Sequence, residues 1–182
     1  MEFNPYQRQG QMDHLQSYFY TDSIFQHKSL LKDDKTKLII IESLQYLVRS
    51  GKIVIYGYVI MPTHIHLIWE ILSLNGNESP AGSLAKFTAH KFKVYLNSKN
   101  PIELEDYRSN KRDRKYQFWN RDPLAIALTS EKSFKQKLEY MHFNPVVGKW
   151  NLADSPENYH WSSAKFYDTG IDEFGIVSDY RL

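Results

Sequence analysis

Short apolar runs alternate along the chain with amphipathic stretches, and the two patterns have different periods. Residues 52–60 and 64–71 are rich in Ile, Val, Tyr and Trp, which predicts two β-strands. The three residues 61–63 between them are few enough for a hairpin. Residues 14–25 have the same β-forming composition and predict a first strand. Residues 116–128 predict a final strand, interrupted at a proline.

Three other stretches have a helical period. The first predicted helix runs from a capping residue, Asp33 or Asp34, to about Arg49. The second covers residues 83–96 and the third covers residues 131–143. The third helix is followed by an Asn-Pro pair, and proline disfavours helical geometry in the residue before it.

The order strand, helix, hairpin, helix, strand, helix predicts an α+β fold. We expect a ferredoxin-like (RRM-like) antiparallel sheet with helices packed on one face. Residues 97–115 are interpreted as a charged, loop-like insertion. The chain length favours one domain over residues 1–182, with a core at about 14–145 and an extension at about 146–182 whose aromatic side chains fold back on the body.

The composition excludes several classes of site. The 182 residues include no cysteine, which removes disulfides, thiolate metal sites and a cysteine nucleophile. No apolar run approaches the roughly 20 residues of a membrane helix. We therefore expect a soluble, cytoplasmic protein that does not bind a membrane.

The net charge is only +2, but its distribution is uneven. Residues 86–115 hold nine Lys or Arg and four acids, a local excess of +5. A concentrated basic segment in a near-neutral protein indicates a partner that is a polyanion, although a solvated basic loop has the same composition.

The hairpin carries two histidines one residue apart. On a strand, residues i and i+2 point to the same face, so His64 and His66 project together. Two neutral imidazoles on a rigid strand form most of a metal site with open positions. Ordinary polar residues on a half-buried strand would give the same pattern.

The third helix presents polar groups beside its apolar stripe. At about 100° per residue, Phe134, Leu138 and Met141 share one narrow face, which predicts burial. Tyr140 lies off that stripe, with Lys137 on its side. Asn144, one turn further on at i+4, shares this side of the helix with them. With 13 tyrosines in the chain, packing at an interface is the simpler interpretation of Tyr140 taken alone.

Three segments together resemble the REP-associated tyrosine transposases of the single-tyrosine HUH transposase superfamily. They are Met61-Pro-Thr-His-Ile-His-Leu-Ile68, Leu138-Glu-Tyr-Met-His-Phe-Asn-Pro-Val146 and Pro156-Glu-Asn-Tyr-His-Trp-Ser-Ser-Ala-Lys-Phe-Tyr167. The resemblance extends from about residue 14 to residue 167, in order and spacing. The chain departs from it at Thr63, where many relatives have Asn, and in the length of the 97–115 insertion.

The resemblance implies a ferredoxin-like fold and a role for each site residue. His64 and His66 would be metal ligands, Asn144 a third ligand through its carbonyl oxygen, and Tyr140 the nucleophile. The metal would be Mg²⁺ or Mn²⁺. Lys137, or less readily His142, could pair with phosphate or assist the phenol, and for each a solvated helix residue is the alternative interpretation.

The implied reaction is cleavage and rejoining of single-stranded or hairpin DNA by transesterification, through a 5′-phosphotyrosine intermediate. A phenol ordinarily has a pKa near 10, so it must lose its proton as it attacks. The implied partners are palindromic DNA repeats, and the protein would act as a monomer or a homodimer. The candidate phosphate contacts are Lys86, His90, Lys91, Lys93, Arg108, Lys111, Arg112, Arg114, Lys115 and Lys137.

Other functions remain open at this stage. A histidine-triad nucleotide hydrolase would need a third alternating histidine, where this chain has Ile68. A zinc hydrolase would need a third strong ligand, and Glu70 is on the correct face but further along the strand. A domesticated protein that binds hairpins without cleaving them could keep the same fold.

Overall fold

Four strands form one antiparallel sheet in a computed structural model that describes residues 12–181. The spatial order is β2-β3-β1-β4, so strands that follow one another along the chain are interleaved in space. With the intervening helices, this order is the ferredoxin-like arrangement. The predicted α+β class is therefore confirmed. The strands are β1 (Ser17–Ser23), β2 (Ile53–Ile60), β3 (His64–Ile71) and β4 (Leu124–Ala127).

Five α-helices and four short 3₁₀ helices accompany the sheet in the described part of the chain. The α-helices are α1 (Asp34–Arg49), α2 (Pro80–Lys99), α3 (Pro101–Glu105), α4 (Glu131–Phe143) and α5 (Ala164–Thr169). The 3₁₀ helices are η1 (Phe25–His27), η2 (Leu30–Lys32), η3 (Asn144–Val146) and η4 (Pro156–Asn158).

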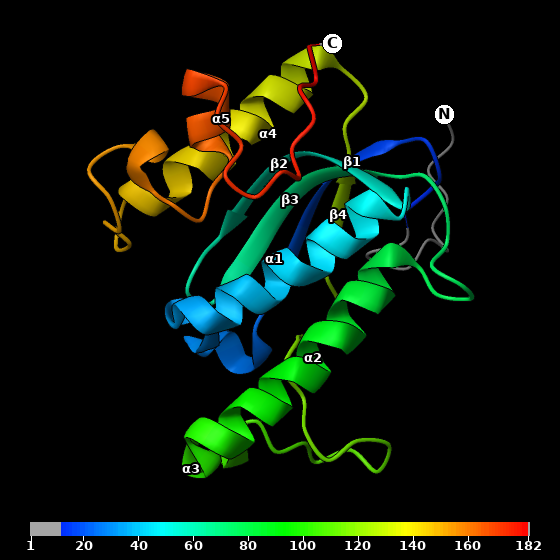
Figure 1. Ribbon diagram of the computed structural model, residues 1–182, viewed down its shortest axis with the longest axis vertical. Coiled ribbons are helices and arrows are strands. Elements are labelled where there is room, and N and C mark those ends of the chain that lie inside the picture. The colour runs from blue at the N-terminus through cyan, green and yellow to red at the C-terminus, as the bar shows by residue number, and fades with distance from the viewer. Residues whose placement is uncertain (1–11, 182) are drawn as a thin grey trace.

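The two faces of the sheet have different covers because side chains alternate along each strand. Tyr20 and Trp69, whose ring centroids are 5.0 Å apart, belong to the buried face that α1 and α2 cover. Phe19 and His66 point to the other face, where α4 packs. In Figure 1, α1 and α2 lie together on one side of the sheet, while α4 and α5 lie together and away from α2.

The segment after α4 returns to the edge of β2. Ile60 N–H donates to the carbonyl of Trp161 at 2.9 Å, and Ser178 N–H donates to the carbonyl of Ile55 at 2.8 Å. Trp161 is buried. The aromatic residues of this extension therefore fold back on the body, and the segment satisfies backbone groups at an edge of the sheet.

Several predicted boundaries move in the structure. α2 begins earlier than residue 83, because Ser79 accepts from Gly82 N–H and caps it. The interval 97–115 is partly helical, since Asn100 caps α3 and Pro101 starts it. β4 is much shorter than the predicted 116–128. Residues before Pro123 form only isolated bridges, one of them between Ile24 and Trp119.

Within residues 12–181, none of the helices combines the length and the apolar character that crossing a membrane requires.

Candidate functional site

His64 and His66 lie side by side on the face of β3 that α4 covers. Their ring centroids are 4.7 Å apart. His66 is 5% exposed, while His64 is half-buried. The alternation of strand residues therefore brings the two imidazoles together, as expected.

A threonine hydroxyl holds one nitrogen of each ring. Thr21 Oγ1 lies 2.7 Å from His66 Nδ1, and Thr63 Oγ1 lies 3.0 Å from His64 Nδ1. Thr21 is the residue directly opposite His66 in the β1–β3 register. Both contacts use Nδ1, which leaves Nε2 as the nitrogen that can face a ligand.

Both imidazoles are held neutral. Burial lowers the pKa of His64 to about 4, with smaller contributions from the charges of His27 and Lys149. Burial likewise lowers the pKa of His66 to about 3, with contributions from His64 and Lys137. At neutral pH each ring therefore keeps a lone pair available for a cation.

The helix α4 is fixed over the sheet by its start and by its apolar stripe. Ser130 and Ser133 form a capping box at its first turn. Phe134, Leu138 and Met141 are buried, as their spacing predicted. They pack above Gly57 of β2, where an added Cβ would lie 2.3 Å from Met141 Cε. Glycine therefore allows a close approach of helix and sheet.

Tyr140 extends from α4 toward the histidines and remains accessible. Its side chain is 54% exposed, and its ring centroid lies 5.8 Å from that of His66 and 6.0 Å from that of Phe19. The Lys137 ammonium sits 5.5 Å from the centre of the Tyr140 ring and 4.9 Å from that of Phe19. A phenol and a positive charge thus lie together beside the imidazole pair.

Asn144 follows α4 at the start of η3 and contacts the same histidine. Its Nδ2 lies 3.0 Å from His66 Nε2. With Nδ2 as the donor, Nε2 accepts and Nδ1 of His66 donates to Thr21. A half-turn of the amide exchanges its nitrogen and oxygen, so Oδ1 can occupy the same position.

The donor set fits a divalent cation that retains open positions. Two neutral imidazoles and one amide oxygen, from His64, His66 and Asn144, offer three donor atoms to such a cation. Among residues 12–181, no group of three or more His, Cys, Asp or Glu side chains could hold a metal ion. Glu70 accepts from the Tyr56 hydroxyl at 3.0 Å instead. The third ligand of a zinc hydrolase is therefore missing from the described residues.

Of the ten candidate phosphate contacts, only Lys137 is placed beside this site. Four lie on α2, against α1 on the opposite face of the sheet, and five lie between α3 and β4. Several of the ten form ion pairs, namely Lys86 with Glu78, Lys91 with Glu42, Arg108 with Glu105 and Arg114 with Asp113.

His142 does not join the site, contrary to the interpretation that it could assist the phenol. It is 8% exposed, and its Nε2 lies 2.8 Å from Ser163 Oγ. Ser163 Oγ also accepts from Tyr58 N–H at 2.9 Å. His142 therefore links α4 to the C-terminal segment and the β2 edge.

Sequence reasoning missed four neighbours of the histidines, namely Phe19, Thr21, Lys149 and Trp150. Phe19 stacks on His66 with centroids 5.1 Å apart, and Thr21 bonds to the same ring. The ring centroid of Trp150 lies 5.8 Å from that of His64, and the Lys149 ammonium lies over the Trp150 ring. The alternation of β1 places Phe19 and Thr21 on one face, but only the pairing register shows that this face is shared with the histidines.

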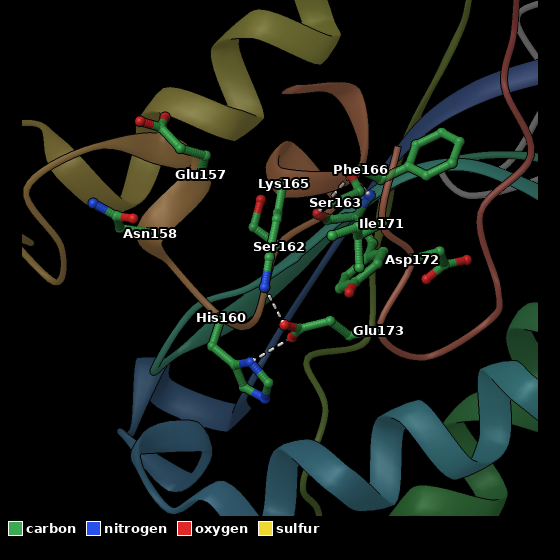
Figure 2. Close-up of a pocket in the computed structure, with 11 residues that line it drawn as sticks. Glu157, Asn158, His160, Ser162, Ser163, Lys165, Phe166, Ile171, Asp172 and Glu173 are labelled. Carbon is green, nitrogen blue, oxygen red and sulfur yellow. Dashed lines mark hydrogen bonds and ion pairs between the residues drawn. The ribbon is translucent and has the colours of Figure 1, made fainter. Parts of the chain in front are cut away.

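A separate hollow of about 180 Å³ lies among the C-terminal segments (Figure 2). Glu173 takes ion pairs from His160 at 2.7 Å and Lys165 at 2.5 Å, and both are drawn as dashed lines in Figure 2. Lys165 is thus already paired with a carboxylate, and the hollow does not include the imidazole pair.

No protein-family model matches the chain, and neither does any curated protein. Among solved structures, the chain is similar to a REP-associated tyrosine transposase bound to a REP hairpin. The identity is 17% and the TM-score 0.56, over 98% of this chain and 92% of that one.

Two further solved structures match with lower scores. One is a transposase candidate from Deinococcus radiodurans R1, with 16% identity and a TM-score of 0.43 over 74% of this chain and 93% of that one. The other is tRNA(His) guanylyltransferase from Saccharomyces cerevisiae, with 11% identity and a TM-score of 0.44 over 76% of this chain and 62% of that one. The first likeness, to the REP-associated transposase, agrees with the fold that the sequence resemblance implied.

Proposed function

We propose that this chain is a tyrosine transposase of the HUH type, which cuts and rejoins single-stranded or hairpin DNA through a covalent bond to Tyr140. One observation carries the proposal. An exposed phenol on α4, an amide one turn later and two neutral imidazoles on β3 converge on one side of the sheet. The fold shared with the hairpin-bound transposase supports the same class of partner.

The reaction exchanges one phosphate ester for another. The Tyr140 oxygen attacks a backbone phosphorus, and the bond from phosphorus to the 3′ oxygen breaks. The protein then carries a 5′-phosphotyrosine. The phenol gives up its proton to solvent, and the departing 3′ oxygen takes a proton from solvent to end as a 3′-hydroxyl. Since one ester replaces another, the reverse attack by the 3′-hydroxyl rejoins the strand without ATP.

The residues around Tyr140 have separate tasks. The Lys137 ammonium offsets negative charge on the phenol and on the phosphate as the bond forms. Thr21 fixes the orientation of the His66 ring. When bound by His64, His66 and Asn144, Mg²⁺ or Mn²⁺ would supply a Lewis acid for a non-bridging phosphate oxygen.

The geometry favours an unpaired strand as the substrate. Tyr140 stands on a helix that packs over the sheet, so a backbone phosphate must enter beside the helix to reach the hydroxyl. Single strands, and hairpins extruded from palindromic repeats, expose such a phosphate. The partner is therefore palindromic DNA in its single-stranded or hairpin form.

A cleavage assay tests the proposal. A labelled single-stranded hairpin is incubated with Mn²⁺ and either the wild-type protein or the Tyr140→Phe variant, and covalent adducts are resolved on a denaturing gel. We expect an adduct with the wild-type protein that the variant abolishes, because phenylalanine lacks the attacking oxygen.

Tyr46→Phe is the matched control, since Tyr46 on α1 is also 54% exposed but lies away from the histidines. It should form the adduct at the wild-type rate. Hairpin binding without an adduct in either Mn²⁺ or Mg²⁺ would contradict the proposed cleavage activity and indicate a hairpin-binding protein instead.

A further inference from the structure

A tight loop after η3 brings a tryptophan back to the histidines. Gly148 and Asn151 both have left-handed backbone conformations, with φ of 62° and 41°. The Leu152 N–H closes the loop on the carbonyl of Pro145 at 2.8 Å. Glycine and asparagine are the residues that adopt this region most readily, so the sequence favours the tight loop. The loop places Trp150 with its ring centroid 5.8 Å from that of His64.

Trp150 differs from the other three tryptophans of the chain. Trp69, Trp119 and Trp161 are buried at 7% exposure or less, whereas Trp150 is only partly buried. The ammonium of Lys149, an exposed residue, lies 5.1 Å from the centre of the Trp150 ring. A partly exposed flat ring with an exposed cation beside it is a combination suited to binding unpaired nucleotides.

We propose that Trp150 and Lys149 form a subsite for the unpaired nucleotide next to the reacting phosphate. The base stacks on the indole, and Lys149 leaves the ring to pair with a neighbouring backbone phosphate. The inference rests on the proposed function, because it takes the position beside His64 as the place where the strand is cut.

The subsite explains how a strand is held without a deep pocket. Tyr140 and Trp150 lie on either side of the histidine pair, since Tyr140 contacts His66 and Trp150 contacts His64. A nucleotide stacked on Trp150 would keep its phosphate over the histidines. Stacking is tolerant of sequence because every base has a flat face.

Tryptophan fluorescence measures the stacking directly. In the Tyr140→Phe background, where no covalent bond forms, the protein is titrated with a single-stranded dT oligonucleotide and with a duplex of equal length. We expect the single strand to quench the emission. Trp150→Ala should weaken single-strand binding about tenfold and leave duplex binding unchanged, because only an unpaired base offers its face.

Two further variants separate stacking from folding. Trp150→Phe keeps a flat ring, so affinity should stay within about threefold while the quenching disappears. Trp161→Phe removes a buried indole and should keep the quenching. Wild-type single-strand affinity in Trp150→Ala, or quenching that persists in Trp150→Phe, would overturn the subsite.

The adduct assay keeps the two proposals apart. With 2-aminopurine placed at successive positions of the hairpin substrate, the strongest quenching should fall on the nucleotide beside the cleaved phosphate. Stacking without any adduct would refute the proposed chemistry. An adduct with no stacking at any position would refute the subsite alone.

Discussion

Thr21 illustrates how a single hydroxyl can set the chemistry of a neighbouring ring. It stands opposite His66 in the sheet, and its Oγ1 lies 2.7 Å from Nδ1. This contact orients the ring so that Nε2 faces Asn144. The hydroxyl is thus positioned to orient a ligand without being one.

Replacing Thr21 with valine should weaken metal binding. Valine has nearly the same shape but cannot hydrogen-bond to Nδ1, so we expect Mn²⁺ affinity to fall about 10- to 100-fold. Titration of Mn²⁺ followed by electron paramagnetic resonance measures it. Thr21→Ser retains the hydroxyl and should bind almost as the wild type does. Equal affinity in Thr21→Val would show that the contact has no role in ligation.

Asp22 is a buried acid on the other face of the sheet. Burial raises its pKa to about 7, although hydrogen bonds from Tyr20 and Ser23 act in the opposite direction. The folded protein therefore holds a proton on Asp22 that the unfolded chain, with a pKa near 3.8, has released. The contribution of Asp22 to the free energy of unfolding is therefore fully present below about pH 4. It is lost as the pH rises through 7.

The Asp22→Asn variant should remove this pH dependence. Between pH 5 and pH 8 the wild type should lose roughly 2–3 kcal/mol of unfolding free energy through Asp22. The amide can still accept from Ser23 N–H and donate to the Tyr20 hydroxyl. Urea unfolding at both pH values measures the difference, and parallel pH profiles for the two proteins would exclude Asp22 as the cause.

Sequence patterns identified the histidine pair and Tyr140 because those groups lie within short, regular segments. The i and i+2 alternation placed His64 and His66 on one face, whereas Tyr140 was singled out by the resemblance of three segments to the REP-associated transposases. Thr21 and Trp150 were not predictable in this way. The position of Thr21 depends on the strand register, and the position of Trp150 depends on a loop with two left-handed residues.

The helix α4 is the element on which the site depends most. Its bounds were predicted to the residue, because a serine caps its start and an Asn-Pro pair follows its end. β4 was predicted too long, since residues 116–121 are rich in β-forming side chains but do not join the ladder. Their backbone groups form hydrogen bonds outside the sheet. For example, Gln117 N–H donates to the carbonyl of Tyr107.

Gly57→Ala should displace α4 from the sheet. The new methyl group would lie 2.3 Å from Met141 Cε and 2.7 Å from Leu138 Cδ1, so the helix or its side chains must shift. We expect a loss of about 1–3 kcal/mol in stability. Adduct formation should slow more than hairpin binding weakens, because Tyr140 moves with the helix.

Thermal unfolding and single-turnover cleavage measure the two effects of Gly57→Ala. Gly82→Ala is the matched control, since its Cβ meets only the Ser79 hydroxyl at 3.2 Å. Gly82→Ala should leave the thermal stability and the cleavage rate close to those of the wild type. Unchanged cleavage in a destabilised Gly57→Ala protein would show that the helix position does not control the phenol.

Over the whole molecule, the ten candidate phosphate contacts fall into two groups. Lys137 lies beside the histidines, whereas α2 and the segment between α3 and β4 carry the other nine. A short oligonucleotide bound at the histidines would contact few of them. A hairpin stem is long enough to reach further, so the two groups of cations should act on different parts of one substrate.

Neutralising cations on α2 should therefore affect hairpins and short strands differently. We expect Lys86→Gln with Lys93→Gln to weaken hairpin binding and to reduce the slope of log affinity against log salt by roughly 2. Binding of a short single strand should not change. Fluorescence anisotropy between 50 and 200 mM salt measures both. Lys132→Gln with Lys135→Gln, on the exposed first turns of α4, is the charge-matched control.

The proximity of Tyr140 to His66 within one polypeptide has a consequence for how copies of the protein would cooperate. On the proposed mechanism, each copy holds all of its reacting groups, so diluting the protein at saturating DNA should not lower the yield of adduct per copy. For the same reason, mixing two inactive variants, His66→Ala and Tyr140→Phe, should restore nothing. Complementation in such a mixture would require α4 to exchange between partners.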